Sequence, residues 1–130
     1  MVENKSREGK GFRKLLVWQR AHELSLLVYQ MTSDFPKPEQ FGLTSQLRRA
    51  AVSVPANIAE GFALGTDPQF LRHLRIAQGS LAEVEYYFIL FHDLHYAQKD
   101  QVEKVESLRA ETGYLLSKLI ASIESRSRKA

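Results

Sequence analysis

The chain has 130 residues, of which 44% are hydrophobic and 25% charged, and it contains no cysteine. This length suits one domain with a real core, and the absence of cysteine excludes disulfides, thiolate zinc sites and cysteine nucleophiles. No apolar run reaches the roughly 20 residues of a membrane-spanning helix, and the run from Leu15 to Trp18 is too short for a signal peptide. We therefore expect a soluble, cytoplasmic protein without membrane contact.

The net charge of +3 comes from the two ends of the chain. Residues 1–14 carry five basic and two acidic residues, and residues 124–130 carry three basic and one acidic residue. The span between them is slightly acidic, which argues against a basic platform on the folded body. We expect a disordered basic tail over residues 1–14, a folded domain over 15–123, and a basic C-terminal tail over 124–130.

From residue 15, apolar residues recur at steps of three and four, the spacing of a packed helix. This first helix should end near Phe35, because Pro36 and Pro38 disfavour helical geometry in the residues before them. Its apolar positions are Val17, Ala21, Leu24, Val28, Met31 and Phe35.

A second helix is expected over about residues 39–61. It combines an apolar stripe with a second stripe of small and polar residues, which would let another helix approach closely. Pro55 lies inside this pattern, so we expect a kink there, or two helical pieces that break near Ser53 and Val54. The two stripes are Leu43, Leu47, Val54 and Ile58, and Gln46, Ala50, Ser53, Asn57 and Glu60.

The third helix should begin with Asp67 as N-cap and Pro68 in its first turn, or with a capping box of Thr66 and Gln69. It should be about 27 residues, or roughly 40 Å, long. The fourth should begin near Asp100 and fray from about residue 125. No segment alternates with period two, so we predict an all-α, up-down-up-down antiparallel four-helix bundle whose second helix is kinked at Pro55.

Several segments resemble the four-helix-bundle proteins encoded in intervening sequences of bacterial 23S ribosomal RNA genes. The similarity covers about residues 15–123. It implies a cytosolic bacterial bundle that assembles as a homopentamer, and kinship with the accessory protein of diversity-generating retroelements, which binds nucleic acid and a reverse transcriptase. Relatives often place basic residues just after the Glu-Gly pair, where this chain has residues 62–66, FALGT. The segments that carry the resemblance are Val17-Trp18-Gln19, Val28-Tyr29, Phe35-Pro36, Gly42-Leu43, residues 46–50 (QLRRA), residues 53–61 (SVPANIAEG) and residues 76–81 (IAQGSL).

Basic residues on the expected helices are candidates for phosphate contacts. If helices two and three form a hairpin about Leu64, however, Arg48 and Arg49 lie near Glu83 and Glu85, and ion pairing within the bundle or between subunits is the favoured use. The same register places Arg72 near Glu60 and leaves Arg75 without an evident acid. With His73, these two arginines form the strongest basic cluster of the domain, although a solvated face is its default interpretation. The nucleic-acid candidates are Arg13, Lys14, Arg48, Arg49, Arg72, Arg75, Arg126 and Arg128.

Aromatic residues outside the main stripes exceed what one slim bundle must hide, which suggests an oligomer interface; alternatively, they cover the ends of the bundle. Ser53, Asn57 and Glu60 could contribute to a subunit contact or bridge the kinked backbone. The interface candidates are Trp18, Ser53, Asn57, Glu60, Phe62, Tyr86 and Tyr87.

The sequence contains no recognisable catalytic motif. His92 and His95 could share a metal with Asp93, but no Glu-x-x-His occurs, and there is no P-loop, Gly-x-Ser-x-Gly or Gly-x-Gly-x-x-Gly motif. We expect no catalytic residue, metal or cofactor. Our leading hypothesis is a non-enzymatic homo-oligomeric scaffold, a pentamer by resemblance, with weak, sequence-independent RNA or DNA binding. The alternatives are a protein–protein adaptor without nucleic-acid binding and, disfavoured, an enzyme that uses Asn57, Glu60 or the histidines.

Overall fold

A computed structural model describes the backbone of residues 11–129, and this part of the chain contains helices and no strand. Four long helices are preceded or connected by two single turns of 3₁₀-helix. The all-α prediction with four helices is confirmed. The elements are η1 (Gly11–Lys14), α2 (Leu16–Thr32), η2 (Lys37–Glu39), α3 (Leu43–Leu64), α4 (Asp67–Asp93) and α5 (Lys99–Lys129).

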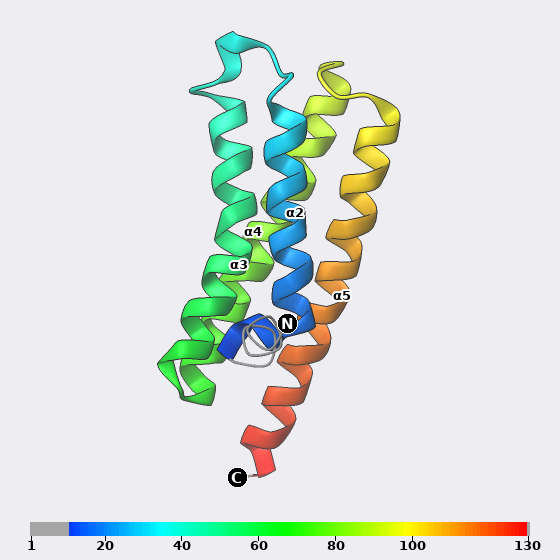
Figure 1. Ribbon diagram of the computed structural model, residues 1–130. Helices are drawn as coiled ribbons and strands as arrows, with labels where there is room; N and C mark the ends of the chain where they lie inside the picture. Colours follow the sequence, from blue (N-terminus) through cyan, green and yellow to red (C-terminus); the bar gives the residue numbers. More distant parts are fainter. Residues whose placement is uncertain (1–10, 130) are drawn as a thin grey trace, which may run out of the picture.

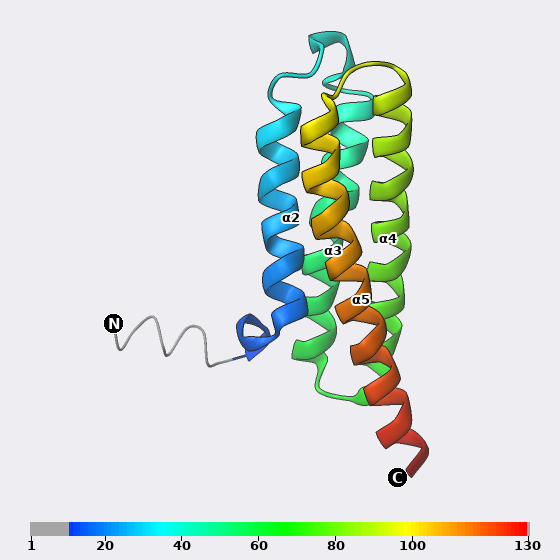
Figure 2. The ribbon, with the colours of Figure 1, turned by 90° about the vertical axis from the view of Figure 1, so that its right-hand side faces the viewer.

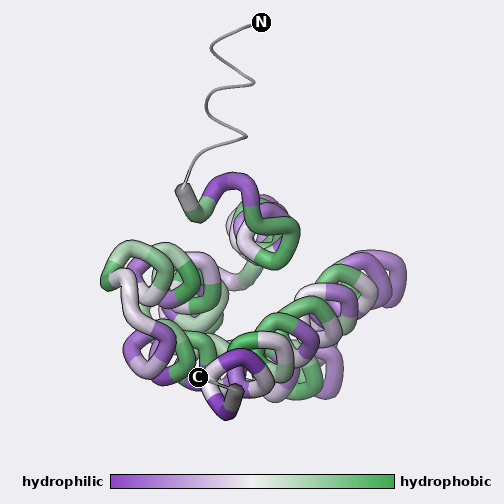
Figure 3. Tube along the Cα trace, turned by 90° about the horizontal axis from the view of Figure 1, so that it is seen from below, coloured by the Kyte–Doolittle hydropathy of each residue, from purple (hydrophilic) through white to green (hydrophobic). Residues whose placement is uncertain are grey.

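The four long helices form one antiparallel bundle (Figures 1 and 2). Each helix contacts the next along the chain, and α5 returns to contact α2, so that every helix has two neighbours. Along each helix hydrophobic and hydrophilic segments alternate (Figure 3), as amphipathic helices around one core require. No helix in the described range is long and apolar enough to cross a bilayer. The largest fully buried side chains are Phe91, Leu24, Leu47, Ile58, Leu74, Leu116 and Ile123.

The ends of the elements differ from expectation in four places. Helix α3 begins at Leu43 and ends at Leu64, not near residues 39 and 61, because η2 takes up Lys37–Glu39. Residues 11–14, expected within a disordered tail, form η1, which contacts α2 and α3; residues 1–10 lie outside the described residues. Helix α2 ends at Thr32, and Phe35 remains in the core because a turn follows in which its amide donates to the Thr32 carbonyl. Helix α5 continues to Lys129 instead of fraying near residue 125, because Arg126 is anchored to Asp67 of α4.

Helix α4 has the predicted length of 27 residues. Of the two starts that the sequence offered, the capping box is correct and Asp67 is not the N-cap. The Thr66 hydroxyl accepts from the Gln69 amide at 3.4 Å and lies 2.7 Å from the Gln69 side-chain oxygen. Asp67 therefore stands in the first turn, where its negative charge complements the helix dipole.

Helix α3 is continuous through Pro55, so a break into two pieces near Ser53 is wrong, while a kink stays a prediction. Proline has no amide hydrogen, and the carbonyl of Ala51 therefore lacks its helical donor. The buried hydroxyl of Ser25 on α2 lies 3.0 Å from that oxygen and 3.2 Å from the carbonyl of Ala21 in its own helix, and it donates to the nearer Ala51 carbonyl. A neighbouring helix thus satisfies the carbonyl that the proline leaves free.

We expect Ser25→Ala to lower the free energy of unfolding by about 1–2 kcal/mol, because it orphans a buried carbonyl. In a Pro55→Ala background the same change should cost about 1 kcal/mol less, since the amide of the new alanine reaches Ala51. Urea unfolding of the two single variants and the double variant measures this coupling. Equal costs in both backgrounds would refute the role given to Ser25.

Candidate functional site

Five polar side chains from α3 and α4 meet where these two helices pack, and we call them the polar network. The hydroxyl oxygens of Ser53 and Ser80 lie 2.7 Å apart. Asn57 donates from its amide nitrogen to the Ser53 carbonyl at 2.8 Å and to the Ser53 hydroxyl at 3.0 Å. Its amide oxygen lies 3.0 Å from Nδ1 of His73, whose Nε2 is 3.6 Å from the Glu60 carboxylate.

These contacts fix the direction of the hydrogen bonds in the polar network. Because the Asn57 nitrogen donates toward Ser53, its oxygen is the atom that faces His73, and Nδ1 of that ring must be the donor. The Ser53 hydroxyl accepts from Asn57 and is free to donate to Ser80. In neutral His73 the proton therefore sits on Nδ1, and Nε2 is turned toward Glu60.

The polar network joins two helices of one chain. Ser53, Asn57 and Glu60 were candidates for a subunit contact, which stays a prediction; their described side-chain partners lie on α3 and α4 of the same protomer. The prediction that small polar residues of the second helix bond across a helix contact is correct. His73, which the sequence places with Arg72 and Arg75 in a basic cluster, is 7% exposed and belongs to this network. It replaces Arg72 as the neighbour of Glu60; Arg72 is exposed.

Gly61 explains how α3 comes so close to His73. A Cβ atom on Gly61 would lie 2.7 Å from the His73 Cβ and 3.0 Å from the Phe70 ring. No side chain larger than hydrogen fits between the helices at this point without moving them. Close approach at Gly61 thus sets the spacing at which His73 can reach Asn57 and Glu60.

The two adjacent arginines of α3 serve different neighbours. Arg49 forms an ion pair with Glu83 at 3.4 Å, as predicted. Arg48 does not approach an acid of α4. Its Nε donates to the Thr32 hydroxyl at 2.7 Å, and its guanidinium lies 4.6 Å from the centroid of the Tyr29 ring. Successive helix positions point about 100° apart, so one arginine faces α4 while the other faces α2.

Two ion pairs between α4 and α5 were not expected from the sequence. Arg75, expected to lack an acid, forms an ion pair with Glu124, and Arg126 binds Asp67 through two nitrogens at 2.7 and 3.0 Å. The hydrogen bond from Arg126 holds the pKa of Asp67 below its ordinary value. These contacts take Arg75 and Arg126 out of the set of unpaired phosphate candidates.

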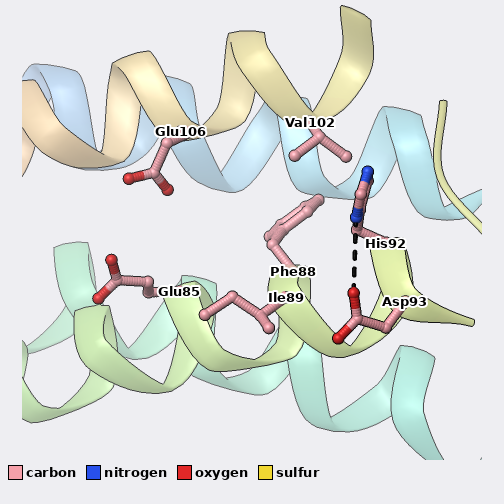
Figure 4. A pocket seen from close by; sticks show the side chains of 7 residues that line it. All are labelled: Glu85, Phe88, Ile89, His92, Asp93, Val102 and Glu106. Carbon is pink, nitrogen blue, oxygen red and sulfur yellow. Dashed lines mark ion pairs between the residues drawn. The ribbon is translucent and has the colours of Figure 1, made fainter. Parts of the chain in front are cut away.

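A cluster of charged side chains lies between α4 and α5, toward the loop that connects them. Arg109 bonds the Glu106 carboxylate and is 3.3 Å from that of Glu85, the acid expected to face Arg48 and Arg49. The hydrogen bond from Arg109 lowers the pKa of Glu106. Beside it lies a cavity of about 320 Å³ (Figure 4), into which Phe88 and Val102 project. His92 at its edge is 3.6 Å from Asp93, and the described residues contain no group of three or more metal-ligating side chains.

Five of the basic candidates have no acid within ion-pair distance in the described part of the chain. One of them, Arg48, bonds Thr32 between α2 and α3, and the other four lie together elsewhere. Arg13 and Lys14 are exposed on η1, Arg72 is exposed near the start of α4, and Arg128 is exposed near the end of α5. Figures 1 and 2 show that these three places lie at the same, lower end of the bundle. We call these four residues the basic end.

Two of the four aromatic interface candidates cover the lower end of the bundle. Trp18 is half-buried, with its ring stacked on His22 at 5.1 Å between centroids, and Phe62 packs edge-on against Phe70 at 5.9 Å. This matches the alternative that aromatics close the ends. Tyr87 packs on Phe91, whereas Tyr86 is 58% exposed.

The exposed tyrosine belongs to an outer face of α4 that carries exposed apolar side chains between Ile76 and Ile89. Ile76 and Ile89 are 41% and 55% exposed, and Gly79 and Ala82 between them are small. The spacing of 76, 79, 82, 86 and 89 places these residues on one side of the helix. Sequence reasoning named Tyr86 but missed the two isoleucines, although the same helical spacing reveals them.

Fold and site together define an antiparallel four-helix bundle whose second and third helices are joined by a buried polar network. A model of the family described as 23S rRNA-intervening sequence protein matches residues 13–118, and the chain belongs to this family. The chain is also similar to a crystal structure of a protein of unknown function from the S23 ribosomal protein family of Bacteroides thetaiotaomicron. The two share 24% identity and a TM-score of 0.74, over 82% of this chain and 96% of the other. The comparison with curated proteins gave no match.

Proposed function

We propose that this protein is a non-enzymatic, homo-oligomeric scaffold of the cytoplasm, a pentamer, which binds RNA or DNA weakly and without sequence preference. The observation that carries the proposal is the basic end. Arg13, Lys14, Arg72 and Arg128 come from three separate elements, are exposed and have no described acidic partner. Cations of this kind are available to neutralise phosphates, and they supply affinity but no base readout.

Self-assembly is supported by the outer face of α4. Three large apolar side chains, Ile76, Tyr86 and Ile89, lie on one exposed side of a helix whose remaining residues there are small. Covering such a face removes apolar surface from water, and small residues between the large ones let a second helix approach. A pentamer would also repeat the basic end five times, so that a modest charge on each protomer becomes a ring with a stronger field.

The polar network supports a structural role over catalysis. Its hydroxyl, amide and imidazole groups bond one another, and His73 is turned into the helix contact. A nucleophile needs an activating base and a neighbouring space for substrate. Hydrogen bonding within the network therefore explains why these polar side chains lie together, and no catalytic role is needed to explain it.

Fluorescence anisotropy with labelled single-stranded RNA and duplex DNA, on the full chain after its mass is determined by light scattering, tests the proposal. We expect binding at about 50 mM salt that weakens at least about tenfold at 200 mM, because neutralising several phosphates releases counterions. The mass should be near five times 14.9 kDa. No binding at low salt by the oligomer would overturn nucleic-acid binding and favour the protein–protein adaptor.

Variants locate the binding site. Replacing Arg13, Lys14 and Arg72 together by glutamine should weaken binding at 50 mM salt at least about tenfold and flatten its salt dependence. Arg49→Gln together with Lys104→Gln and Lys118→Gln is the matched control, since it removes equal charge from exposed positions outside the basic end. Equal losses in both triple variants would show that net charge, and not the basic end, controls binding.

A further inference from the structure

A polar pocket of about 230 Å³ lies at the upper end of the bundle, between the end of α2 and the start of α3. This is the end opposite the basic end (Figure 1), so the pocket is separate from the phosphate contacts proposed above. The connection through η2 contributes Lys37 and, directly after η2, Gln40 to its lining. Its polar lining residues are Thr32, Ser33, Lys37, Gln40, Thr44 and Arg48.

The first turn of α3 borders this pocket. Helix α3 has 22 residues, its N-cap is Gly42, and no side chain bonds the free amides of its first turn. No acidic residue stands in that turn either. The free amides of this turn therefore receive no hydrogen bond from a side chain, and the nearest acid is Glu39, one carboxylate oxygen of which lies beside Gly42.

Thr44 supplies a second, independent observation at this pocket. Its side chain lines the pocket, the residue is only 4% exposed, and its hydroxyl oxygen is buried without a hydrogen-bond partner in the described part of the chain. A buried hydroxyl without a partner is costly, and such groups are rare in folded proteins. It is the single buried side-chain polar atom in this state among the described residues.

Two cations complete the lining. Arg48 is positioned by its hydrogen bond to Thr32, by the Tyr29 ring and by a 3.4 Å hydrogen bond from Nη2 to the Tyr29 carbonyl, which leaves Nη1 available as a donor. Lys37 lies across the pocket on η2, and neither cation has an acid within ion-pair distance in the described range. Glu39, the acid of η2, accepts from the Tyr96 hydroxyl at 3.1 Å through Oε2, while its Oε1 lies beside Gly42.

We infer that this pocket binds a phosphate group. Two cations, a hydroxyl, an amide side chain and a helix N-terminus converge on it, and an oxyanion offers only acceptors to such donors. The volume lies below the roughly 300 Å³ at which pockets for drug-sized ligands begin, so the phosphate group itself is the recognised unit. Inorganic phosphate and the terminal phosphate of a mononucleotide share this chemistry.

Isothermal titration calorimetry of the full chain with inorganic phosphate and, separately, with AMP tests the inference, at fixed ionic strength with chloride as the reference. We expect saturable binding of phosphate. Binding of AMP with similar affinity would mean that an esterified phosphate is accepted, and its absence would restrict the pocket to the free anion. No saturable binding of either ligand would overturn the inference.

Two variants identify the pocket as the site. Lys37→Gln should weaken phosphate binding about tenfold, because it removes one charge-assisted contact. Thr44→Val should weaken it severalfold while leaving the unliganded protein at least as stable in urea, because valine removes a hydroxyl that has no partner. Lys104→Gln, an exposed lysine of α5, is the control and should bind as the wild type does. Wild-type affinity in both Lys37→Gln and Thr44→Val would assign any observed binding to another surface and refute the inference.

Discussion

Replacing Gly61 by alanine is expected to lower the free energy of unfolding by about 2 kcal/mol, although alanine is the better helix former. The new methyl group would lie 2.7 Å from the His73 Cβ and 3.0 Å from the Phe70 ring. A Cβ atom is fixed to its backbone, so relief requires α3 and α4 to separate. Overpacking of this kind costs roughly 3 kcal/mol at the upper end of its range, and the gain in helix propensity returns about 1 kcal/mol.

Gly79 provides the matched control within the same helix pair. It lies inside α4, is exposed, and a Cβ atom placed on it meets nothing within 4 Å. Within one protomer, Gly79→Ala should therefore stabilise the fold by about 0.5–1 kcal/mol, the ordinary gain for this change in a helix interior. Because Gly79 lies on the face proposed for self-assembly, this comparison is made on dilute, monomeric protein. Urea unfolding of both variants checks the two signs. If both changes stabilise, the close contact at Gly61 does not limit the approach of the helices.

Much of the fold follows from periodicity in the sequence. The apolar residues of the first helix recur at steps of three and four, and all six of its predicted stripe positions are buried. Short polar connections between long amphipathic segments dictate antiparallel neighbours, which the structure confirms. Boundaries were less predictable, because they depend on contacts outside the local pattern. Phe35 stays in the core beyond the last turn of α2, and Arg126 extends α5 by binding α4.

The partners of charged residues depended on helix register. The predicted hairpin about Leu64 correctly brought Arg49 near Glu83. It paired Asn57 with a position about two residues before His73, the residue that Asn57 actually contacts. The turn actually includes Gly65, in the left-handed conformation, and the Thr66 cap, so that the register shifts toward α4. A shift of one or two residues on a helix rotates the partner by 100° or more, which is why Arg72 was expected where His73 stands.

Contacts of α5 could not be derived from the sequence in the same way. Arg75 with Glu124 and Arg126 with Asp67 join residues 49 and 59 positions apart. The register of α5 against α4 is set by the loop of residues 94–98. In this loop His95 adopts a positive φ of 62°, which could not be predicted from the sequence. Likewise, the unpartnered hydroxyl of Thr44 is visible only once η2 and α3 are placed in space.

Asn57→Leu is expected to lower the free energy of unfolding by about 3 kcal/mol. Leucine matches asparagine in shape but neither accepts from His73 nor donates to Ser53. The imidazole N–H is then buried without an acceptor, and each orphaned polar group costs about 1–3 kcal/mol. Gln46→Ala, at an exposed amide on the same helix, is the control and should change stability by less than about 0.5 kcal/mol.

A double-mutant cycle with His73→Leu separates hydrogen bonding from packing. His73→Leu alone should also cost about 2 kcal/mol, because it orphans the amide oxygen of Asn57. In the double variant both partners are apolar, so no polar group is left without a hydrogen bond. The decrease in its free energy of unfolding should therefore be at least about 1 kcal/mol smaller than the sum of the decreases in the two single variants. Additive losses would mean that the two side chains contribute only volume. Coupling would mean that the hydrogen bond itself holds α3 and α4 in register, and with them the helix face and the basic end that the proposed scaffold presents.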